Sequence, residues 1–199
     1  AATISSTLGY LRSRASELDG VHVDLDTTPL QDEGVSLGLG SGGASAIAIA
    51  GALFEAAGLS VEGQARQWDL LTLAAHTQSV VRGAMASGSD VAAAAYGGMV
   101  VYRRGGAVSP VQLPDGIHWA VVRSEAGVQT GSMMFRAPGD SGGPPKRVTE
   151  ALGAVSAAAE QVVDALDDGG TAFLNAMRIF VGSTDQLGER TGVVLTTPG

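Results

Sequence analysis

The sequence contains no cysteine, which excludes disulfide bridges, thiolate nucleophiles and zinc sites built on cysteine. Basic residues are scarce as well: 12 Lys and Arg stand against 20 Asp and Glu, so the formal net charge is -8. Nucleic acids and anionic membranes bind basic surfaces, and this charge therefore argues against both as the main partner. An acidic protein can still bind a nucleotide locally, through backbone N–H groups and a divalent metal.

Long hydrophobic runs are also missing. The apolar stretch over 44–57 is too short to cross a membrane and contains Glu55. The first residues lack the basic and then apolar pattern of a secretion signal. These absences predict a soluble cytoplasmic protein with no membrane partner.

The composition that remains is typical of a globular protein with a buried core, because 45% of the 199 residues are hydrophobic. Hydrophobic periodicity of 3.6 predicts helices, and alternation predicts strands. Both patterns occur throughout the chain, so the predicted fold class is α/β (α+β). The predicted helices cover 5–18, 44–57, 61–81, 90–95, 148–166 and 171–181, and the predicted strands cover 21–26, 99–102, 117–123 and 129–136.

A glycine-rich loop precedes the helix predicted over 44–57. Residues 38–46 read Gly-Leu-Gly-Ser-Gly-Gly-Ala-Ser-Ala. Glycines let the backbone approach a phosphate closely, and the free N–H groups of the first helical turn point at it. The loop matches neither a Walker loop nor a dinucleotide-binding fingerprint. Tight packing is an equally common reason for such a turn, so this loop alone does not decide the function.

A second loop, Ser87–Gly98, places one carboxylate, Asp90, among residues with little bulk. Asp is among the best helix N-caps, and a cap is the simplest interpretation of Asp90. A carboxylate beside a transferred phosphoryl group can instead orient and deprotonate the attacking group, while small neighbours leave room for a substrate.

The two loops, in this order, resemble those of the GHMP kinases, and within that family the phosphomevalonate kinases. Gly38–Ala44 resembles the family's Gly-Leu-Gly-Ser-Ser-Ala-Ala loop, and Ser87–Gly98 resembles the stretch Gly-Ser-Gly-x-Asp-Val-Ala-Ala-x-x-Tyr-Gly-Gly. Val101–Arg104 and Gly142–Val148 match shorter stretches. The resemblance covers about 19–181 and implies an ATP-dependent, Mg²⁺-assisted phosphotransferase of isoprenoid biosynthesis.

The resemblance also implies roles for individual residues. Asp90 would be catalytic, and Ser41 would also help to hold Mg²⁺. His76 lies where the family often has an Ala-His pair, and its role is left open. Arg103 and Arg104 end a predicted strand and are interpreted as solvent-exposed. The implied ATP-phosphate ligands are Gly38, Gly40, Ser41, Gly42, Gly43, Ala44 and Ser45, and the implied ligands of the small-molecule acceptor are Ser87, Gly88, Ser89, Lys146 and Arg147.

The sequence departs from the family pattern in two ways. The family's first and third motifs are absent from the 199 residues, which predicts an internal portion of a two-layer fold that is incomplete at both ends. Residues 1–136 would then belong to the ATP-binding N-terminal domain and 137–199 would begin the C-terminal domain. Gly42 stands where the family usually has a Ser that assists Mg²⁺.

These departures leave the activity of the 199-residue chain open. One alternative is a catalytically impaired relative that binds a nucleotide or a protein. Another is a kinase of the mevalonate kinase or galactokinase type that acts on a sugar or an alcohol. The oligomeric state also stays open, a homodimer included.

Overall fold

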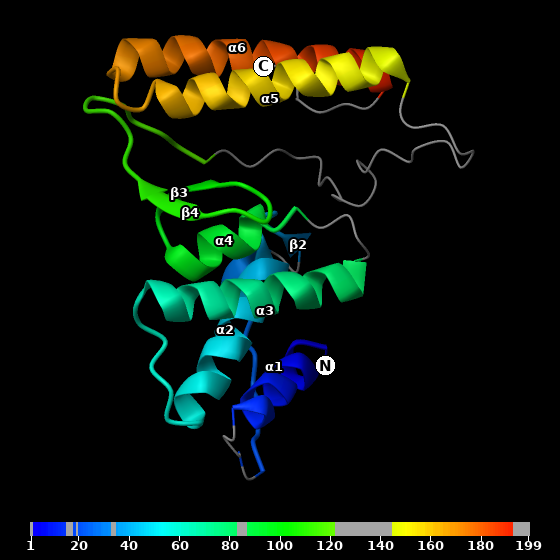
Figure 1. The fold of residues 1–199 in the computed structure, drawn as a ribbon, viewed down its shortest axis with the longest axis vertical. Coiled ribbons are helices and arrows are strands. Elements are labelled where there is room, and N and C mark those ends of the chain that lie inside the picture. Colours follow the sequence, from blue (N-terminus) through cyan, green and yellow to red (C-terminus); the bar gives the residue numbers. More distant parts are fainter. Residues whose placement is uncertain are drawn as a thin grey trace. The chain divides into compact units, whose positions relative to one another are not determined.

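The computed structural model describes residues 2–14, 18, 20–32, 35–82, 87–121 and 145–192. The chain forms two compact units, Ala1–Val111 and Gln112–Gly199 (Figure 1). Helices and short antiparallel strands alternate in the first unit, so the predicted α+β class is confirmed. The predicted domain boundary at 136/137 lies outside the described residues.

The first unit contains four helices and two strand pairs in its described part. β1 pairs with β2 so that Gln31 faces Ser36, and β3 pairs with β4 so that Met99 faces Val111. The elements are α1 (Ala2–Ser13), a short 3-10 helix η1 (Thr28–Leu30), β1 (Gln31–Asp32), β2 (Val35–Ser36), α2 (Ser41–Ala56), α3 (Gln64–Arg82), α4 (Ser89–Tyr96), β3 (Met99–Tyr102) and β4 (Val108–Val111).

Helix α2 ends where the sequence predicts. Gly58 has a φ of 73°, a left-handed conformation that favours glycine. Its N–H donates to the carbonyl of Glu55 at 2.9 Å, and the N–H of Leu59 donates to that of Phe54 at 2.9 Å. This is the Schellman arrangement, which satisfies the last carbonyls of a helix.

Phe54, near the end of α2, joins three helices. Its side chain is fully buried, and the ring of Tyr10 on α1 stacks on it with 5.5 Å between centroids. The hydroxyl of Tyr10 donates to Asp69 on α3 at 3.0 Å, and Asp69 also pairs with Arg66 at 3.3 Å. The Arg66 guanidinium lies 5.4 Å from the Phe54 ring centroid. Burial, stacking and a cation–π contact therefore hold α1, α2 and α3 together.

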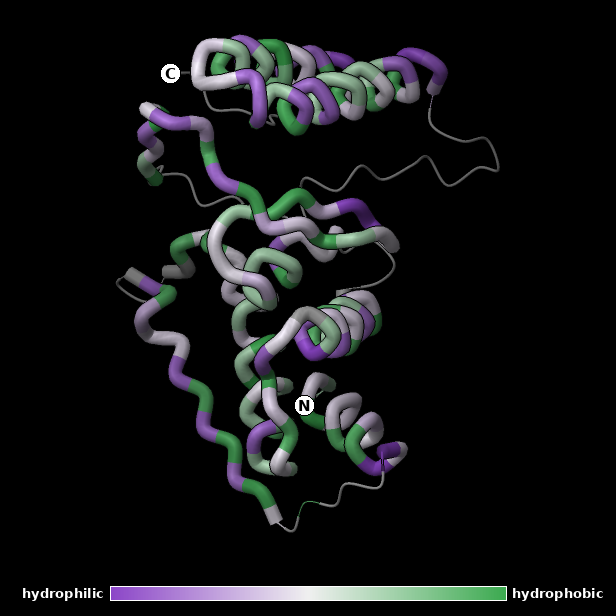
Figure 2. Tube along the Cα trace, turned by 60° about the vertical axis from the view of Figure 1, so that its left-hand side comes forward, coloured by the Kyte–Doolittle hydropathy of each residue, from purple (hydrophilic) through white to green (hydrophobic). Residues whose placement is uncertain are grey.

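The strand predicted over 21–26 is wrong. The segment carries the expected alternation of polar and apolar residues (Figure 2), yet it pairs with no strand among the described residues. A strand needs a neighbour to bond its N–H and C=O groups, and alternation alone supplies none. The same correction applies to 117–121, the described part of the strand predicted over 117–123. The strand predicted over 129–136 lies outside the described residues.

The helix predictions hold with shifted ends. The first helix begins at Ala2 and ends at Ser13 instead of Leu18, although Leu18 still packs against the core around Phe54. The helix predicted over 44–57 begins at Ser41, because the loop glycines continue into its first turn. The last helix is longer than predicted and reaches Thr191.

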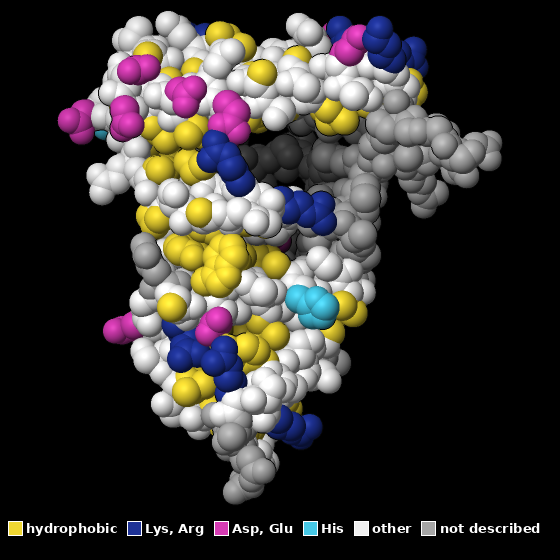
Figure 3. Space-filling view, in the orientation of Figure 1, with side chains coloured by type: hydrophobic (Ala, Val, Ile, Leu, Met, Phe, Trp, Pro, Cys, Tyr) yellow, Lys and Arg dark blue, Asp and Glu magenta, His cyan; other side chains and the backbone are white. Residues whose placement is uncertain are grey.

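In the second unit, α5 (Lys146–Asp164) and α6 (Gly170–Thr191) form a helical hairpin. Ile117 packs against Phe173 and Ala165 near the turn of this hairpin. A Cβ added at Gly170 would lie 3.2 Å from Ile117 Cδ1, which leaves little space for a larger residue. Acidic side chains gather around the same turn (Figure 3), where the sequence has Asp164, Asp167 and Asp168.

Thr7 on α1 should be replaceable with a gain in stability. Its side chain is fully buried, and its Oγ1 has no hydrogen-bond partner in the part of the chain that the structure describes. Thr7→Val removes that unsatisfied hydroxyl at nearly constant volume, so we expect the free energy of unfolding in urea to rise by about 1 kcal/mol.

Thr77 provides the control, since it is equally buried but its Oγ1 donates to the carbonyl of Leu73 at 2.9 Å. Thr77→Val should therefore lower the free energy of unfolding. A loss of stability in both variants would show that the Thr7 hydroxyl has a partner after all.

Candidate functional site

The glycine-rich loop leads directly into α2. Gly38 and Gly40 both have a φ of 73°, and Gly40 occupies the N-cap position of the helix. Gly40 has no side chain to cap this helix, and the first turn carries no acidic residue. The N–H groups that open every α-helix have no acceptor within the helix, and the positive end of the helix dipole favours an anion there.

Helix α4 brings Asp90 to this loop. A Cβ atom added at Gly43 would lie 3.0 Å from Asp90 Oδ2 and 3.0 Å from the backbone nitrogen of Val91. A Cβ added at Gly40 would lie 3.2 Å from Asp90 Cβ. Two loops far apart in the sequence thus lie in direct contact.

Asp90 is not the N-cap of α4. Gly88 holds that position with a φ of 82°, and Asp90 lies inside the first turn of the helix. The simple interpretation of Asp90 as a helix cap is therefore wrong. Its half-buried carboxylate lies at the start of two helices, α4 by sequence and α2 by contact, where helix dipoles stabilise negative charge.

A cavity of about 150 Å³ opens at the first turns of α2. Its wall includes three of the predicted phosphate ligands, Ser41, Gly42 and Ser45. The other wall residues are Thr27, Leu30 and Gln31, none of which the sequence singled out.

The wall segment is held by its own hydrogen bonds. The Thr28 N–H donates to Asp26 Oδ1 at 2.9 Å, and hydrogen bonds from the Thr28 side chain and backbone lower the pKa of Asp26. Gln31 Nε2 donates to Thr27 Oγ1 at 3.0 Å. The run Asp-Thr-Thr-Pro is typical of a turn, which is a usable sequence signal. Nothing in the local sequence indicates that this turn lies beside the glycine loop.

A second residue that the sequence did not single out is Gln78 on α3. Its Nε2 donates to the carbonyl oxygen of Gly42 at 2.8 Å, in a half-buried position. Gln78 therefore contacts the loop from the side of α3, while Asp90 contacts it from α4.

The other predicted ligands occupy two places. Ser87, Gly88 and Ser89 immediately precede or open α4, next to Asp90, with 3.1 Å between the two serine Oγ atoms. Lys146 and Arg147 lie in the second unit, exposed at the start of α5, where Lys146 Nζ is 3.8 Å from Glu150. Their role toward a substrate stays a prediction.

Several secondary candidates are exposed. His76 on α3 is exposed. The strand-end residues Arg103 and Arg104 are exposed, as predicted for these two arginines. Trp68 and Trp119 are 42% and 72% exposed, although the large apolar ring of tryptophan favours burial. No group of three or more His, Asp or Glu that could hold a metal occurs in the described ranges. The oxygens near the loop still suit Mg²⁺, which retains waters and relies on substrate phosphates.

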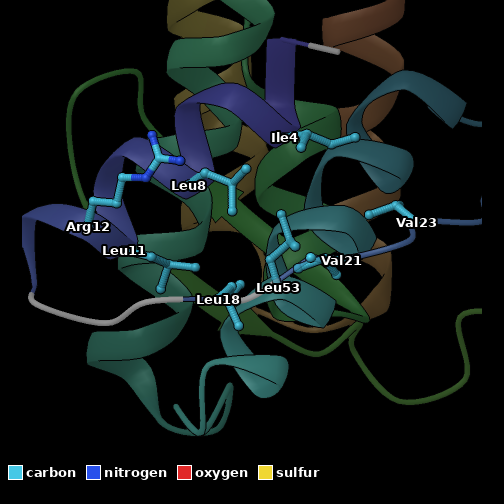
Figure 4. A pocket seen from close by; sticks show the side chains of 9 residues that line it. Ile4, Leu8, Leu11, Arg12, Leu18, Val21, Val23 and Leu53 are labelled. Atoms are coloured by element: carbon cyan, nitrogen blue, oxygen red, sulfur yellow. The ribbon is translucent and has the colours of Figure 1, made fainter.

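A larger cavity of about 320 Å³ lies elsewhere in the first unit (Figure 4). Its wall is apolar apart from Arg12 and includes Leu53 near the end of α2. At about 1.5 Å per helical residue, Leu53 is about 18 Å along the axis from the loop end of α2. This cavity is therefore separate from the glycine loop.

Comparison with protein families supports one interpretation of the two loops. Residues 2–98 match the family model described as GHMP kinases N terminal domain. This stretch of the chain is similar to that domain. The match spans α1 to α4, with both loops and Asp90, and supports the GHMP kinases, a family of small-molecule phosphotransferases that use ATP.

Comparisons with curated proteins and with solved structures gave no match. None of the helices in the described ranges combines the length and apolarity that crossing a membrane requires.

Helix α2 should not tolerate Ala at position 43. The added Cβ would be only 3.0 Å from three atoms of Asp90 and Val91, two of them backbone atoms that cannot rotate away. Overpacking of this kind typically costs about 1–3 kcal/mol, so Gly43→Ala should lower the free energy of unfolding in urea by that amount.

Gly51→Ala is the matched control in the same helix, because its Cβ would meet Val61 Cγ1 at an ordinary 3.8 Å. That change should stabilise α2 by up to about 1 kcal/mol through helix propensity. A Gly43→Ala protein as stable as the wild type would show that α2 and α4 do not approach this closely.

Proposed function

We propose that this chain is the nucleotide-binding part of an ATP-dependent kinase that transfers the γ-phosphoryl group to phosphomevalonate. The observation that carries the proposal is the contact between Asp90 and Gly43. It combines a carboxylate and a helix start with glycine at its N-cap, inside the stretch that matches the GHMP domain. Phosphoryl transfer needs these two elements, an anion site for the phosphates of ATP and a group that acts on the attacking oxygen.

In this mechanism the N–H groups of Gly40 to Gly43 bind the ATP phosphates, whereas the N–H of Ala44 already donates to the Gly40 carbonyl at 3.0 Å. The hydroxyls of Ser41 and Ser45, two residues of the cavity wall, add further donors. Mg²⁺, with Ser41 as its protein ligand, would neutralise charge on the phosphates. An oxygen of the acceptor forms a bond to the γ-phosphorus, the bond to the β–γ bridging oxygen breaks, and ADP leaves with the electron pair. Asp90 orients the acceptor and takes any proton that it loses.

The substrate assignment rests on the second loop. Ser87–Gly98 resembles the corresponding stretch of phosphomevalonate kinases more than that of sugar or alcohol kinases. Ser87, Gly88 and Ser89 adjoin Asp90, so we propose that they contact the acceptor.

One feature supports a second candidate, a relative that binds nucleotide without turnover. Gly42 supplies no hydroxyl where the family usually has one for Mg²⁺. In this alternative the loop still binds ATP, but the chemical step is slow because the metal is poorly held.

Asp90→Asn should nearly abolish turnover at about pH 5, where the phosphate of the acceptor still carries the proton that Asp90 takes. Asn keeps the size and shape of Asp but cannot accept a proton, and loss of a general base typically costs a factor of about 10² to 10⁴ in rate. Affinity for ATP, measured by calorimetry with Mg²⁺ present, should change little. Wild-type turnover in the Asn variant would refute the catalytic role of Asp90.

The pH profile of Asp90→Asn then distinguishes the two classes of acceptor. The second pKa of a phosphate monoester is about 6, so a phosphate acceptor loses its proton without help at higher pH. The deficit of the variant should therefore shrink as the pH rises from about 5 to 8. A hydroxyl acceptor, as in a sugar or alcohol kinase, would leave the deficit constant over that range.

Gly42→Ser tests the alternative without turnover. If a hydroxyl at this position assists Mg²⁺, the Ser variant should show higher turnover at limiting Mg²⁺ than the wild type. Gly42→Ala is the control, because it also replaces glycine with a residue of higher helix propensity but adds no oxygen ligand. Equal turnover of the Ser and Ala variants would mean that the missing hydroxyl does not limit activity.

A further inference from the structure

The first turn of α2 is weak by composition. Gly42 and Gly43 are adjacent, and glycine loses more backbone entropy in a helix than any other residue. Gly40 at the N-cap has no side chain to cap the turn and adds a third flexible residue. An anion site at a helix start works only if its N–H groups are already aligned, because aligning them on binding would cost affinity. Contacts from outside α2 must therefore hold this turn.

Gln78 provides such a contact. On α3, Ala74 and Thr77 are 0% and 1% exposed, and Gln78 follows them on the same face. From there its Nε2 donates to the Gly42 carbonyl at 2.8 Å. In an α-helix this carbonyl already accepts the N–H of residue 46, so Gln78 uses its second lone pair.

The same part of α3 is anchored independently. Leu71 and Ala74 form a buried cluster with Ala46 of α2 and with Val91 and Ala92 of α4. Gln78 therefore extends from a packed helix, and its amide can fix the position of the Gly42 peptide group. Asp90 contacts the next residue, Gly43, from α4.

We propose that Gln78 is a positioning residue of the nucleotide site. Through the Gly42 carbonyl it holds the first turn of α2 in the conformation that binds phosphate. Its effect on nucleotide affinity rests on the proposed function, but its effect on the backbone of α2 does not. The two effects can therefore be measured separately.

Three variants isolate the contact. Gln78→Met keeps the volume and removes the donor, and Gln78→Glu replaces the donor with a negative charge beside the anion site. Gln78→Asn keeps the amide but shortens its reach, which provides a milder change if the others fold poorly. Gln67→Met is the control: this residue is half-buried on the same helix, about 16 Å along the axis at 1.5 Å per residue.

The first measurement is amide hydrogen exchange at Ala44, Ser45 and Ala46 in the protein without nucleotide, followed by NMR. Loss of a typical hydrogen bond should speed exchange there by about two- to tenfold in Gln78→Met. Gln67→Met should leave these rates unchanged. Unchanged rates in Gln78→Met would overturn the proposal, whatever the protein binds.

The second measurement is calorimetric affinity for ATP with Mg²⁺. We expect about a two- to tenfold loss in Gln78→Met and a larger loss in Gln78→Glu. Faster exchange with unchanged affinity would show that Gln78 holds the helix but does not serve the site, which also overturns the proposal. A wild type that binds no ATP would refute the proposed function, and the exchange rates would still decide whether Gln78 positions the loop.

A double-mutant cycle adds a readout that general destabilisation would not produce. Gly42→Ala restricts the same backbone without Gln78, so the loss of affinity caused by Gln78→Met should be smaller when it is combined with Gly42→Ala. Equal losses with and without the Gly42→Ala change would mean that Gln78 does not act through Gly42.

Discussion

The close approach of α2 and α4 is the constraint on which the candidate site depends. It requires Gly43, since a Cβ at this position would lie only 3.0 Å from atoms of Asp90 and Val91. It also requires small residues behind the contact, where Ala46, Ala74 and Ala92 are buried between three helices. Low side-chain bulk, conspicuous in the composition, is thus what lets a carboxylate from one helix reach the start of another.

The two ends of α2 have different physical characters. The C-terminal end contains Phe54, fully buried and enclosed by Tyr10 and Arg66, and it finishes in a satisfied Schellman turn. The N-terminal end consists of glycines and leaves its N–H groups unbonded within the helix. The packed C-terminal end stabilises the helix, so its N-terminal turn can consist of residues with low helix propensity. Ligand-binding segments generally lie in the less stable parts of a fold.

Local patterns predicted much of this structure. The glycine loop, the cap at Gly58, the strand over Met99–Tyr102 and the succession of helices all follow from spacing and residue type. The contact between the two loops followed only from a family resemblance, because neither loop carries a local sign of the other. The contributions of Gln78, Thr27 and Gln31 were missed for the same reason: a polar residue on a helix or turn looks solvated until its neighbour is known.

The segment over 21–26 failed in the opposite way. Its alternation is a correct description of an extended chain, but pairing depends on a partner that the segment itself does not specify. Structure was predicted correctly where the stabilising hydrogen bonds are local in sequence, as at Gly58. Where an element is stabilised by a residue distant in the sequence, its structure could be predicted only if that residue was known.

The order of contacts along the chain has a kinetic consequence. The α5–α6 hairpin joins consecutive helices through a short turn, so little chain must be closed before its contacts form. Gly43 and Asp90 are separated in the sequence by the whole of α3. Bringing them into contact closes a long loop, which costs entropy before any packing is gained. During synthesis or refolding, helices of this protein would therefore form well before the contact between Gly43 and Asp90 exists, and helix content would be a poor measure of whether that contact has formed.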